Sequence, residues 1–306
     1  MPTFSVIIPH KNCPELLKRC VESVPETDDV EIILIDDNSD DKQLLYDCLK
    51  KINRSNLIVI ESSKGGWAGG SRNIGLDKAT GEWILFLDAD DYFLSEAFAQ
   101  FYNYSTTDND IIYFKHQSVY SDTLQPCDRF PYRNQIIQSY LEQPTINNRE
   151  QVMFGDVVPW GKMIRRALIY DNNISYDEIP CCEDVMFITR CAANAKQIEA
   201  SERVVYCLTY RSSSLTMAYS KEKDWIGYNV SLQRNEMLKS IKSKYHKIRL
   251  LSFIWQALRR YGVKESIKYI KEARSSGHSI FEGLFFSPAE LKDRLVALIQ
   301  KDSYQG

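Results

Sequence analysis

The chain alternates short apolar runs with longer segments in which apolar residues recur every three or four positions. Four apolar runs predict buried strands, at 4–9, 31–35, 57–60 and 83–87. The segments 15–24 and 44–52 predict amphipathic helices, and the glycine-rich loop 65–70 leads to a third helix that Ser71 is expected to cap. Strands that alternate with helices favour a mostly parallel sheet. The first third of the chain therefore predicts an α/β layer of the nucleotide-binding type.

The pattern weakens after residue 104. Residues 110–114 and 204–206 predict two more strands, and 183–192 predicts a helix. The stretch 118–148 is polar, aromatic and irregular, and the chain from 221 to its end has helical spacing. We therefore expect an α/β fold with a mixed, mostly parallel sheet flanked by helices, followed by a C-terminal helical extension.

Composition is that of an ordinary globular protein. The 306 residues are 44% hydrophobic and 26% charged, and the formal net charge of −3 gives no bias toward nucleic acid. Eight cysteines form no C-x-x-C pair, and no apolar run approaches the ~18 residues of a membrane-spanning helix. The first residues predict a strand rather than a signal peptide. We expect a cytoplasmic protein with no nucleic-acid partner.

Charge is nevertheless uneven along the chain. Residues 237–275 contain eleven Lys or Arg and only two Glu, a net +9, so the remainder carries −12. Apolar residues are interleaved with these basic residues. Two interpretations remain open: a basic amphipathic region that lies peripherally on an anionic membrane, at the inner face of the cytoplasmic membrane, or helices packed on the body with a solvated basic face.

The fourth apolar run ends in three carboxylates spaced around one alanine: Asp88, Ala89, Asp90 and Asp91. Ligands of an open α/β sheet bind just beyond the carboxyl ends of its strands. Carboxylates that lie together raise each other's pKa unless a cation neutralises them, and their oxygens suit Mg²⁺ or Mn²⁺. The motif therefore indicates a metal-bound phosphorylated ligand; a solvated acidic turn is the alternative.

Two further polar clusters follow the first and second predicted strands. The first run ends in Pro9, His10, Lys11 and Asn12, and the second in Asp36 and Asp37. A parallel sheet would bring both clusters and the Asp88–Asp90 motif to one crevice.

Together these motifs resemble those of the family 2 glycosyltransferases. The matching segments are 5–9, 31–39, 72–75 and 86–91, with 160–162 and 183–187 further along. The resemblance covers about residues 3–220. It implies a GT-A-type, Rossmann-like fold with a donor-binding half (1–105), an acceptor-binding half (106–220) and a helical region (221–306).

The resemblance implies an inverting, metal-dependent transfer from a nucleotide sugar, of the kind used in bacterial surface-polysaccharide synthesis. Asp37 would accept a hydrogen bond from the N3–H of uracil, which favours a UDP-sugar, although guanine is not excluded. The segment Pro9 to Asn12 would lie at the base, and Arg72, with Gly66 and the helix start, at the diphosphate. Asp90, with Asp88 and Ala89, would hold Mn²⁺ or Mg²⁺.

By motif position, Asp184 is the base that deprotonates the acceptor hydroxyl, and its neighbour Glu183 orients or contacts the acceptor. A capping role is the alternative for Asp184. Trp160 and Lys162 are assigned to the acceptor, a saccharide or lipid-linked saccharide, although Trp160 equally suits a core position. Residues 210–216 resemble a late loop that closes over the donor.

One residue departs from the family pattern. Many members carry an aromatic residue at the position of Lys11, so Lys11 or His10 would have to cover the base.

Other protein classes fit the sequence less well. A metal-dependent phosphatase has its Asp-x-Asp near the N-terminus, whereas here the motif begins at Asp88. A dehydrogenase needs G-x-G-x-x-G after its first strand, where this chain has Pro9, His10 and Lys11. The main alternative is a degenerate glycosyltransferase-like binding protein, which the complete set of carboxylates disfavours.

Overall fold

The computed structural model describes residues 2–62, 66–211, 220–243 and 250–281. The chain divides into two compact units, residues 1–219 and 220–306, which are described separately.

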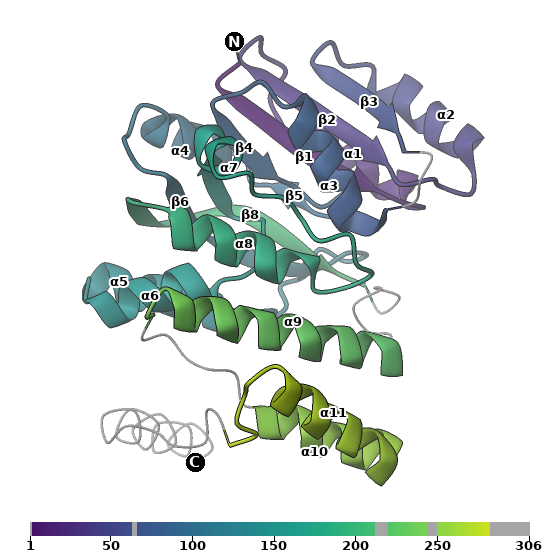
Figure 1. The fold of residues 1–306 in the computed structure, drawn as a ribbon. Helices are drawn as coiled ribbons and strands as arrows, with labels where there is room; N and C mark the ends of the chain where they lie inside the picture. The colour runs from purple at the N-terminus through teal and green to yellow at the C-terminus, as the bar shows by residue number, and fades with distance from the viewer. Residues whose placement is uncertain (1, 63–65, 212–219, 244–249, 282–306) are drawn as a thin grey trace, which may run out of the picture. The chain divides into compact units, whose positions relative to one another are not determined.

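The first unit is built on one eight-stranded sheet (Figure 1). Its strands are β1 (Phe4–His10), β2 (Val30–Asp36), β3 (Leu57–Glu61), β4 (Trp83–Phe86), β5 (Tyr92–Phe93), β6 (Ile111–Tyr120), β7 (Lys162–Arg165) and β8 (Ile198–Tyr210). Their order is β3-β2-β1-β4-β7-β6-β8-β5. Strands β3, β2, β1 and β4 are mutually parallel, and β6 is parallel to β8. Strand β7 is antiparallel to both of its neighbours. The predicted mixed, mostly parallel sheet is confirmed.

Helices lie on both sides of this sheet. They are α1 (Pro14–Glu22), α2 (Lys42–Ile52), α3 (Trp67–Lys78), α4 (Ala97–Tyr104), α5 (Pro131–Glu142), α6 (Ile146–Gly155), α7 (Arg166–Asp171) and α8 (Glu183–Asn194). Side chains of β1 alternate between the two faces: Phe4, Val6 and Ile8 join a buried cluster with α1 and α4, whereas Ile7 faces α3. Both faces of β1 are therefore covered by helices.

Two sequence predictions differ from the structure. The segment 118–148, expected to be irregular, contains the end of β6, all of α5 and the start of α6. Its polar and aromatic composition hid the helical period because α5 buries only two of its residues, Arg133 and Ile137. Helix α3 begins at Trp67 with Gly66 before it, so Ser71 lies inside the helix and does not cap it.

The second unit contains three described helices: α9 (Lys221–Ser240), α10 (Leu250–Tyr261) and α11 (Val263–Ser275). Its apolar core is formed by Tyr228 and Leu232 of α9, Ile254 of α10 and Tyr269 of α11, among others. The predicted C-terminal helical extension is confirmed. No helix among the described residues is long and apolar enough to cross a bilayer.

Candidate active site

The loops that follow β1 and β2 lie side by side at the carboxyl edge of the sheet. The Asn12 side chain donates to Oδ2 of Asp40 at 2.9 Å and accepts the Asp40 backbone N–H at 2.8 Å. The backbone N–H of Asp37 donates to the carbonyl of His10 at 2.8 Å. These bonds bring the first two polar clusters of the sequence together.

Arg72 connects the third cluster to the helix that begins at Glu183. Its Nη2 lies 2.8 Å from Oδ1 of Asp88, and its Nη1 lies 2.9 Å from Oδ1 of Asp184 and 3.1 Å from Oε1 of Glu183. Arg72 is only 3% exposed. We predicted Arg72 as a diphosphate contact; in this structure its guanidinium is instead surrounded by three carboxylates.

Two glycines of α3 allow Arg72 to reach this position. A Cβ atom at Gly75 would lie 2.5 Å from Cγ2 of Ile7, and one at Gly69 would lie 2.5 Å from the carbonyl oxygen of Asp177. Any larger residue would push α3 away from the sheet on one side or from the 177–183 segment on the other. Because Arg72 lies three residues from each glycine, both close approaches determine where its guanidinium sits.

The neighbouring Asn73 fastens α3 to the same segment. Its side-chain amide donates to the carbonyl of Tyr176 at 3.0 Å and accepts the Tyr176 backbone N–H at 2.8 Å. The Tyr176 ring stacks on Phe187 of α8, with centroids 3.8 Å apart, and lies 5.4 Å from the Arg72 guanidinium carbon. Tyr176 lies in a segment without helical or strand periodicity, so the sequence gave no indication of this role.

Asp37, the predicted base-reading residue, is buried at the start of α3. Its Oδ1 accepts the backbone N–H of Gly66 at 2.9 Å, and its Oδ2 lies 3.6 Å from Nζ of Lys11. Half of the Lys11 side chain is exposed. Gly66 and Lys11 thus both lie beside Asp37, the carboxylate that is predicted to bind the uracil ring.

His10 does not cover the base in this structure. It is 1% exposed, and its Nδ1 lies 3.0 Å from Oδ1 of Asp36. Asp36 also accepts hydrogen bonds from Ser39 and Lys42. The structure therefore disfavours a base contact by His10: Asp36 holds the imidazole inside the fold, and burial lowers the His10 pKa. Pro9, the preceding residue of β1, is half-buried.

Asp90 of the Asp-Ala-Asp turn pairs with Arg211, which lies in the predicted late loop but was given no role of its own. Nη2 of Arg211 is 2.9 Å from Oδ2 of Asp90. Burial and the nearby Asp88 raise the Asp90 pKa, whereas Arg211 opposes the rise. Of the late loop predicted at 210–216, Tyr210 and Arg211 are described; the rest lies outside the described residues.

The donor set around Asp88 and Asp90 fits a divalent ion that also binds a phosphorylated ligand. Both side chains are 29% exposed and offer hard carboxylate oxygens. Within the described ranges no group of three or more His, Cys, Asp or Glu could hold a metal by itself. An ion with one or two protein carboxylates completes its shell with phosphate oxygens and water.

Trp160 supports this turn from the inside. It is 4% exposed, and its ring stacks on Tyr206 with centroids 4.8 Å apart. The Tyr206 hydroxyl donates to Oδ2 of Asp91 at 2.7 Å and accepts the backbone N–H of Asp88 at 3.3 Å. Ala89 is also buried in this core. Of the two roles predicted for Trp160, the structure favours the core position, because Tyr206 covers one face of its ring.

Lys162 is also inside the protein. It is 2% exposed, and its Nζ lies 2.9 Å from Oδ2 of Asp156 and donates to the carbonyl of Val158 at 2.6 Å. Arg133 pairs with the other oxygen of Asp156 at 2.8 Å. Burial lowers the Lys162 pKa to about 7, although Asp156 opposes this. The structure therefore does not support an acceptor contact by Lys162, because its amino group pairs with Asp156 inside the fold.

Asp184 is the carboxylate of this cluster whose pKa best suits proton transfer near neutral pH. Burial raises its pKa to about 7; Arg72 opposes the rise, while Glu183 and Asp88 add to it. The side chain keeps 27% of its surface exposed, so an incoming hydroxyl can approach it. Cys182 precedes the helix with a left-handed φ of 63°, and no side chain caps the helix. The Asp184 side chain therefore forms an ion pair with Arg72 and does not cap α8.

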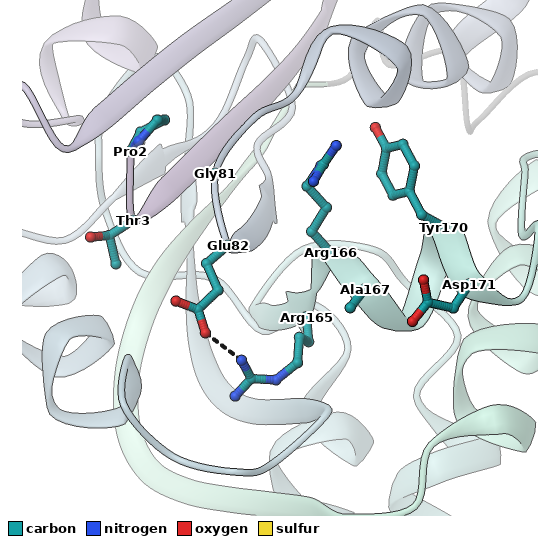
Figure 2. A pocket seen from close by; sticks show the side chains of 9 residues that line it. All are labelled: Pro2, Thr3, Gly81, Glu82, Arg165, Arg166, Ala167, Tyr170 and Asp171. Carbon is teal, nitrogen blue, oxygen red and sulfur yellow. Dashed lines mark hydrogen bonds and ion pairs between the residues drawn. The ribbon is translucent and has the colours of Figure 1, made fainter.

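A separate cleft of about 570 Å³ lies away from these carboxylates (Figure 2). Its lining includes Thr3 and Glu82, which precede β1 and β4, together with Arg165, Arg166 and Tyr170. It is therefore at the amino end of these parallel strands, opposite the candidate site. Ligands of α/β sheets bind at the carboxyl end, so the carboxylate cluster is the stronger candidate.

A parallel sheet with polar clusters gathered beyond its strand ends is the architecture of a nucleotide-binding α/β protein. Residues 5–172 match the family described as glycosyl transferase family 2, and this is more than half of the 306 residues. The chain belongs to that family, as its motifs predicted.

Named relatives agree with this assignment. The chain is 26% identical to the putative glycosyltransferase EpsH of Bacillus subtilis, over 72% of this chain and 64% of EpsH. It is 24% identical to WfaP of Escherichia coli, named UDP-Glc:alpha-D-GlcNAc-diphosphoundecaprenol beta-1,3-glucosyltransferase, over 84% of this chain and 94% of WfaP.

The fold is similar to that in a crystal structure of S. aureus TarS 1-349 in complex with UDP-GlcNAc. The TM-score is 0.68 at 23% identity, over 90% of this chain and 80% of the TarS chain, a likeness that establishes the fold. For three relatives by sequence, the match spans 64%, 35% and 62% of their length, so the chain spans less than two thirds of each.

Proposed function

We propose that the protein is an inverting glycosyltransferase that moves a sugar from a UDP-sugar to a saccharide or lipid-linked saccharide. The observation that carries the proposal is the Arg72 contact set, which holds Asp88 and Asp184 on one guanidinium, at 2.8 and 2.9 Å. A donor-side carboxylate and a candidate base thus contact the two terminal nitrogens of the same guanidinium. Residues 1–105 would form the donor half and 106–220 the acceptor half.

Asp37 is proposed to select the base. Its carboxylate is fixed by Gly66 N–H at one oxygen and has a partly exposed Lys11 near the other. The second oxygen would accept the N3–H of uracil, with Lys11 beside the ring or a phosphate. Asn12, which joins the two loops, would keep the opening in shape. The names of WfaP and of the TarS complex, which both mention a UDP-sugar, support uridine as the nucleoside.

Asp90 and Asp88 are proposed to hold Mn²⁺ or Mg²⁺ at the diphosphate. When bound, such an ion neutralises charge that develops on the departing nucleoside diphosphate. The guanidinium of Arg211 lies 2.9 Å from the Asp90 carboxylate, beside the same position. We propose that Arg211 contributes positive charge to the diphosphate once the ion takes its place on Asp90.

Asp184 is proposed as the general base. Its carboxylate would take the proton of the acceptor hydroxyl as the oxygen attacks the anomeric carbon. The bond from that carbon to the diphosphate oxygen breaks in the same displacement, its electron pair leaves with UDP, and the configuration inverts. A pKa raised to about 7 suits proton transfer near neutral pH. Glu183, which shares Arg72, would orient the acceptor and Asp184.

The acceptor is proposed to be a saccharide, free or carried on a lipid diphosphate. The supporting observation is the match over 84% of this chain to WfaP, whose name gives a diphosphoundecaprenol-linked sugar as its acceptor. Because Trp160 and Lys162 are buried, acceptor contacts would come from the exposed surface near Glu183 and the segment before it.

A turnover assay tests the proposal. A panel of nucleotide sugars is incubated with Mn²⁺ and candidate acceptors, and release of the nucleoside diphosphate is measured. Wild-type protein should release UDP from at least one UDP-sugar, whereas Asp184→Asn should lose about 10²–10⁴-fold in rate while still binding UDP. The matched control is Asp171→Asn, an exposed carboxylate in the distant cleft. Unchanged turnover in Asp184→Asn would remove Asp184 as the base.

A further inference from the structure

Helix α11 of the second unit exposes a face that contains apolar and basic residues but no acidic one. Val263, Ile267, Lys271 and Arg274 are spaced three or four residues apart, so they share one side of the helix. Val263 is 65% exposed and Ile267 is 44% exposed. Lys264 is exposed on the same side. The opposite side packs Tyr269 and Ala273 into the core of the unit.

Three basic residues on this face have no acidic partner among the described residues of the unit. Among the residues that the structure describes, Lys264, Lys271 and Arg274 form no ion pair, whereas Lys268 pairs with Glu265 at 3.9 Å. Glu265 is buried and is also held by Lys221 at 2.6 Å. The exposed face therefore presents unpaired positive charge next to exposed apolar side chains.

Helix α10 adds a second exposed aromatic and basic pair. Trp255 is 58% exposed, and Arg259 lies one turn further along the same side. Leu250, Ile254 and Ala257 occupy the buried side. Both helices thus use one side for the core of the unit and leave the other open. Of the basic segment 237–275, residues 244–249 lie outside the described residues.

We propose that the exposed sides of α10 and α11 dock on an anionic lipid bilayer. The residues proposed to contact lipid are Trp255 and Arg259 on the exposed side of α10, and Val263, Lys264, Ile267, Lys271 and Arg274 on the exposed side of α11. Charge complementarity selects an anionic partner, and the apolar residues select a lipid surface, because a helix in the interfacial plane buries its apolar side chains between headgroups and acyl chains. A polyanion such as nucleic acid would pair with the lysines but leave Val263 and Ile267 in water.

The two contributions make different predictions. Each Lys or Arg near an anionic leaflet strengthens partitioning by about 5-fold, and this attraction weakens in salt. Burial of Val263 and Ile267 depends on apolar surface and is not screened. Loss of two lysines should therefore weaken binding by about 25-fold at low salt. Loss of the two apolar side chains should weaken it at both low and high salt.

Co-sedimentation of the full chain with vesicles tests the proposal. The vesicles contain either phosphatidylcholine alone or phosphatidylcholine with phosphatidylglycerol, at low and high salt. The charge variant is Lys264→Gln/Lys271→Gln, with Lys50→Gln/Lys51→Gln of α2 as its control. The apolar variant is Val263→Ser/Ile267→Ser, with Ile146→Ser, at a position 72% exposed in the first unit, as its control. Thermal melts confirm that each variant is folded.

Wild type and both controls should sediment with anionic vesicles at low salt, and both test variants should bind more weakly. Three results would each overturn the proposal: no binding of wild type to anionic vesicles at low salt, equal loss in a test variant and its control, or binding to a short DNA duplex that is as tight and unaffected by Val263→Ser/Ile267→Ser. The assay involves no nucleotide sugar, so its failure leaves the proposed transfer activity intact.

Discussion

The Nη1 nitrogen of Arg72 lies 2.9 Å from Oδ1 of Asp184, and the same guanidinium reaches Asp88 at 2.8 Å. The two carboxylates come from residues almost a hundred positions apart in the chain. One buried cation therefore fixes the separation between the candidate base and the candidate donor side of the site. A planar guanidinium with several N–H donors can do this, whereas an ammonium group cannot hold the same geometry.

Replacement of Arg72 by Lys should change the pH dependence of turnover. Asp184 must be deprotonated to act as a base, so kcat should fall as the pH falls through about 7 in the wild type. A lysine keeps the positive charge, but its ammonium group cannot hold Asp88 and Asp184 together as the guanidinium does. It should therefore lower the Asp184 pKa less than Arg72 does, and the acidic limb should move to higher pH. Misplacement of the base should also lower the plateau rate by about 10²-fold. Full pH–rate profiles of both proteins make the measurement.

Arg190→Lys is the control for that experiment, because Arg190 pairs with Asp177 at 2.9 Å just outside the cluster. Its profile should match the wild type. An acidic limb at the same pH in wild type and Arg72→Lys would contradict the claim that the guanidinium geometry of Arg72 sets the Asp184 pKa.

Asp184→Asn should stabilise the protein while it removes activity. A carboxyl whose folded-state pKa is raised from 3.8 to about 7 favours the neutral form in the fold. The charged form therefore costs stability at pH values above 7, part of this cost remains between 3.8 and 7, and none remains below 3.8. Thermal melts above pH 7 should show a higher Tm for Asp184→Asn, and melts below 3.8 should show no gain. A lower Tm at high pH would contradict this.

Trp160 should matter for stability and, through Tyr206, for the strand-end turn. Trp160→Ala should cost about 3–5 kcal/mol in the free energy of unfolding, because a buried ring is deleted. Trp160→Phe keeps an aromatic face against Tyr206 and should cost less. Denaturant unfolding measures both variants. A loss of acceptor affinity without a loss of stability would contradict the buried position.

Asp37→Asn should alter base preference more than it alters the fold. The amide keeps an oxygen for Gly66 N–H but offers an N–H₂ group where the carboxylate accepted the uracil N3–H. UDP affinity should fall by about 10- to 100-fold, and the ratio of UDP to CDP affinity should fall with it, because cytosine N3 is an acceptor. Calorimetric titrations of both nucleotides measure the ratio; an unchanged ratio would assign base reading elsewhere.

The sheet and the location of the site could be predicted from the sequence because both depend on local patterns. Apolar runs define the strands, and strand direction then determines that His10, Asp36 and Asp88 emerge at one edge. The contacts of those residues depend on distant packing. Arg72 meets Glu183 across 111 positions, and Tyr206 meets Asp91 across 115, so no periodicity carries that information.

Burial of Trp160 and Lys162 was hidden for a related reason. Lysine is rarely buried unless it is paired, and its partner Asp156 lies in a segment without a clear pattern. Trp160 fitted a core or a sugar-binding position equally well until Tyr206 was seen to cover its ring. Arg211 follows the last strand directly, but only the paired Asp90 gives it a place in the site.

The proposed donor site is tested most directly by calorimetric titration of UDP into wild type and Asp90→Ala, each with Mn²⁺ and with a chelator. Asp171→Asn with Mn²⁺ serves as the control. Wild type with Mn²⁺ should bind UDP most tightly, and chelation should weaken it to the level of Asp90→Ala, which should no longer respond to the ion. Equal UDP affinity in all four conditions would contradict a metal-assisted diphosphate site at Asp90.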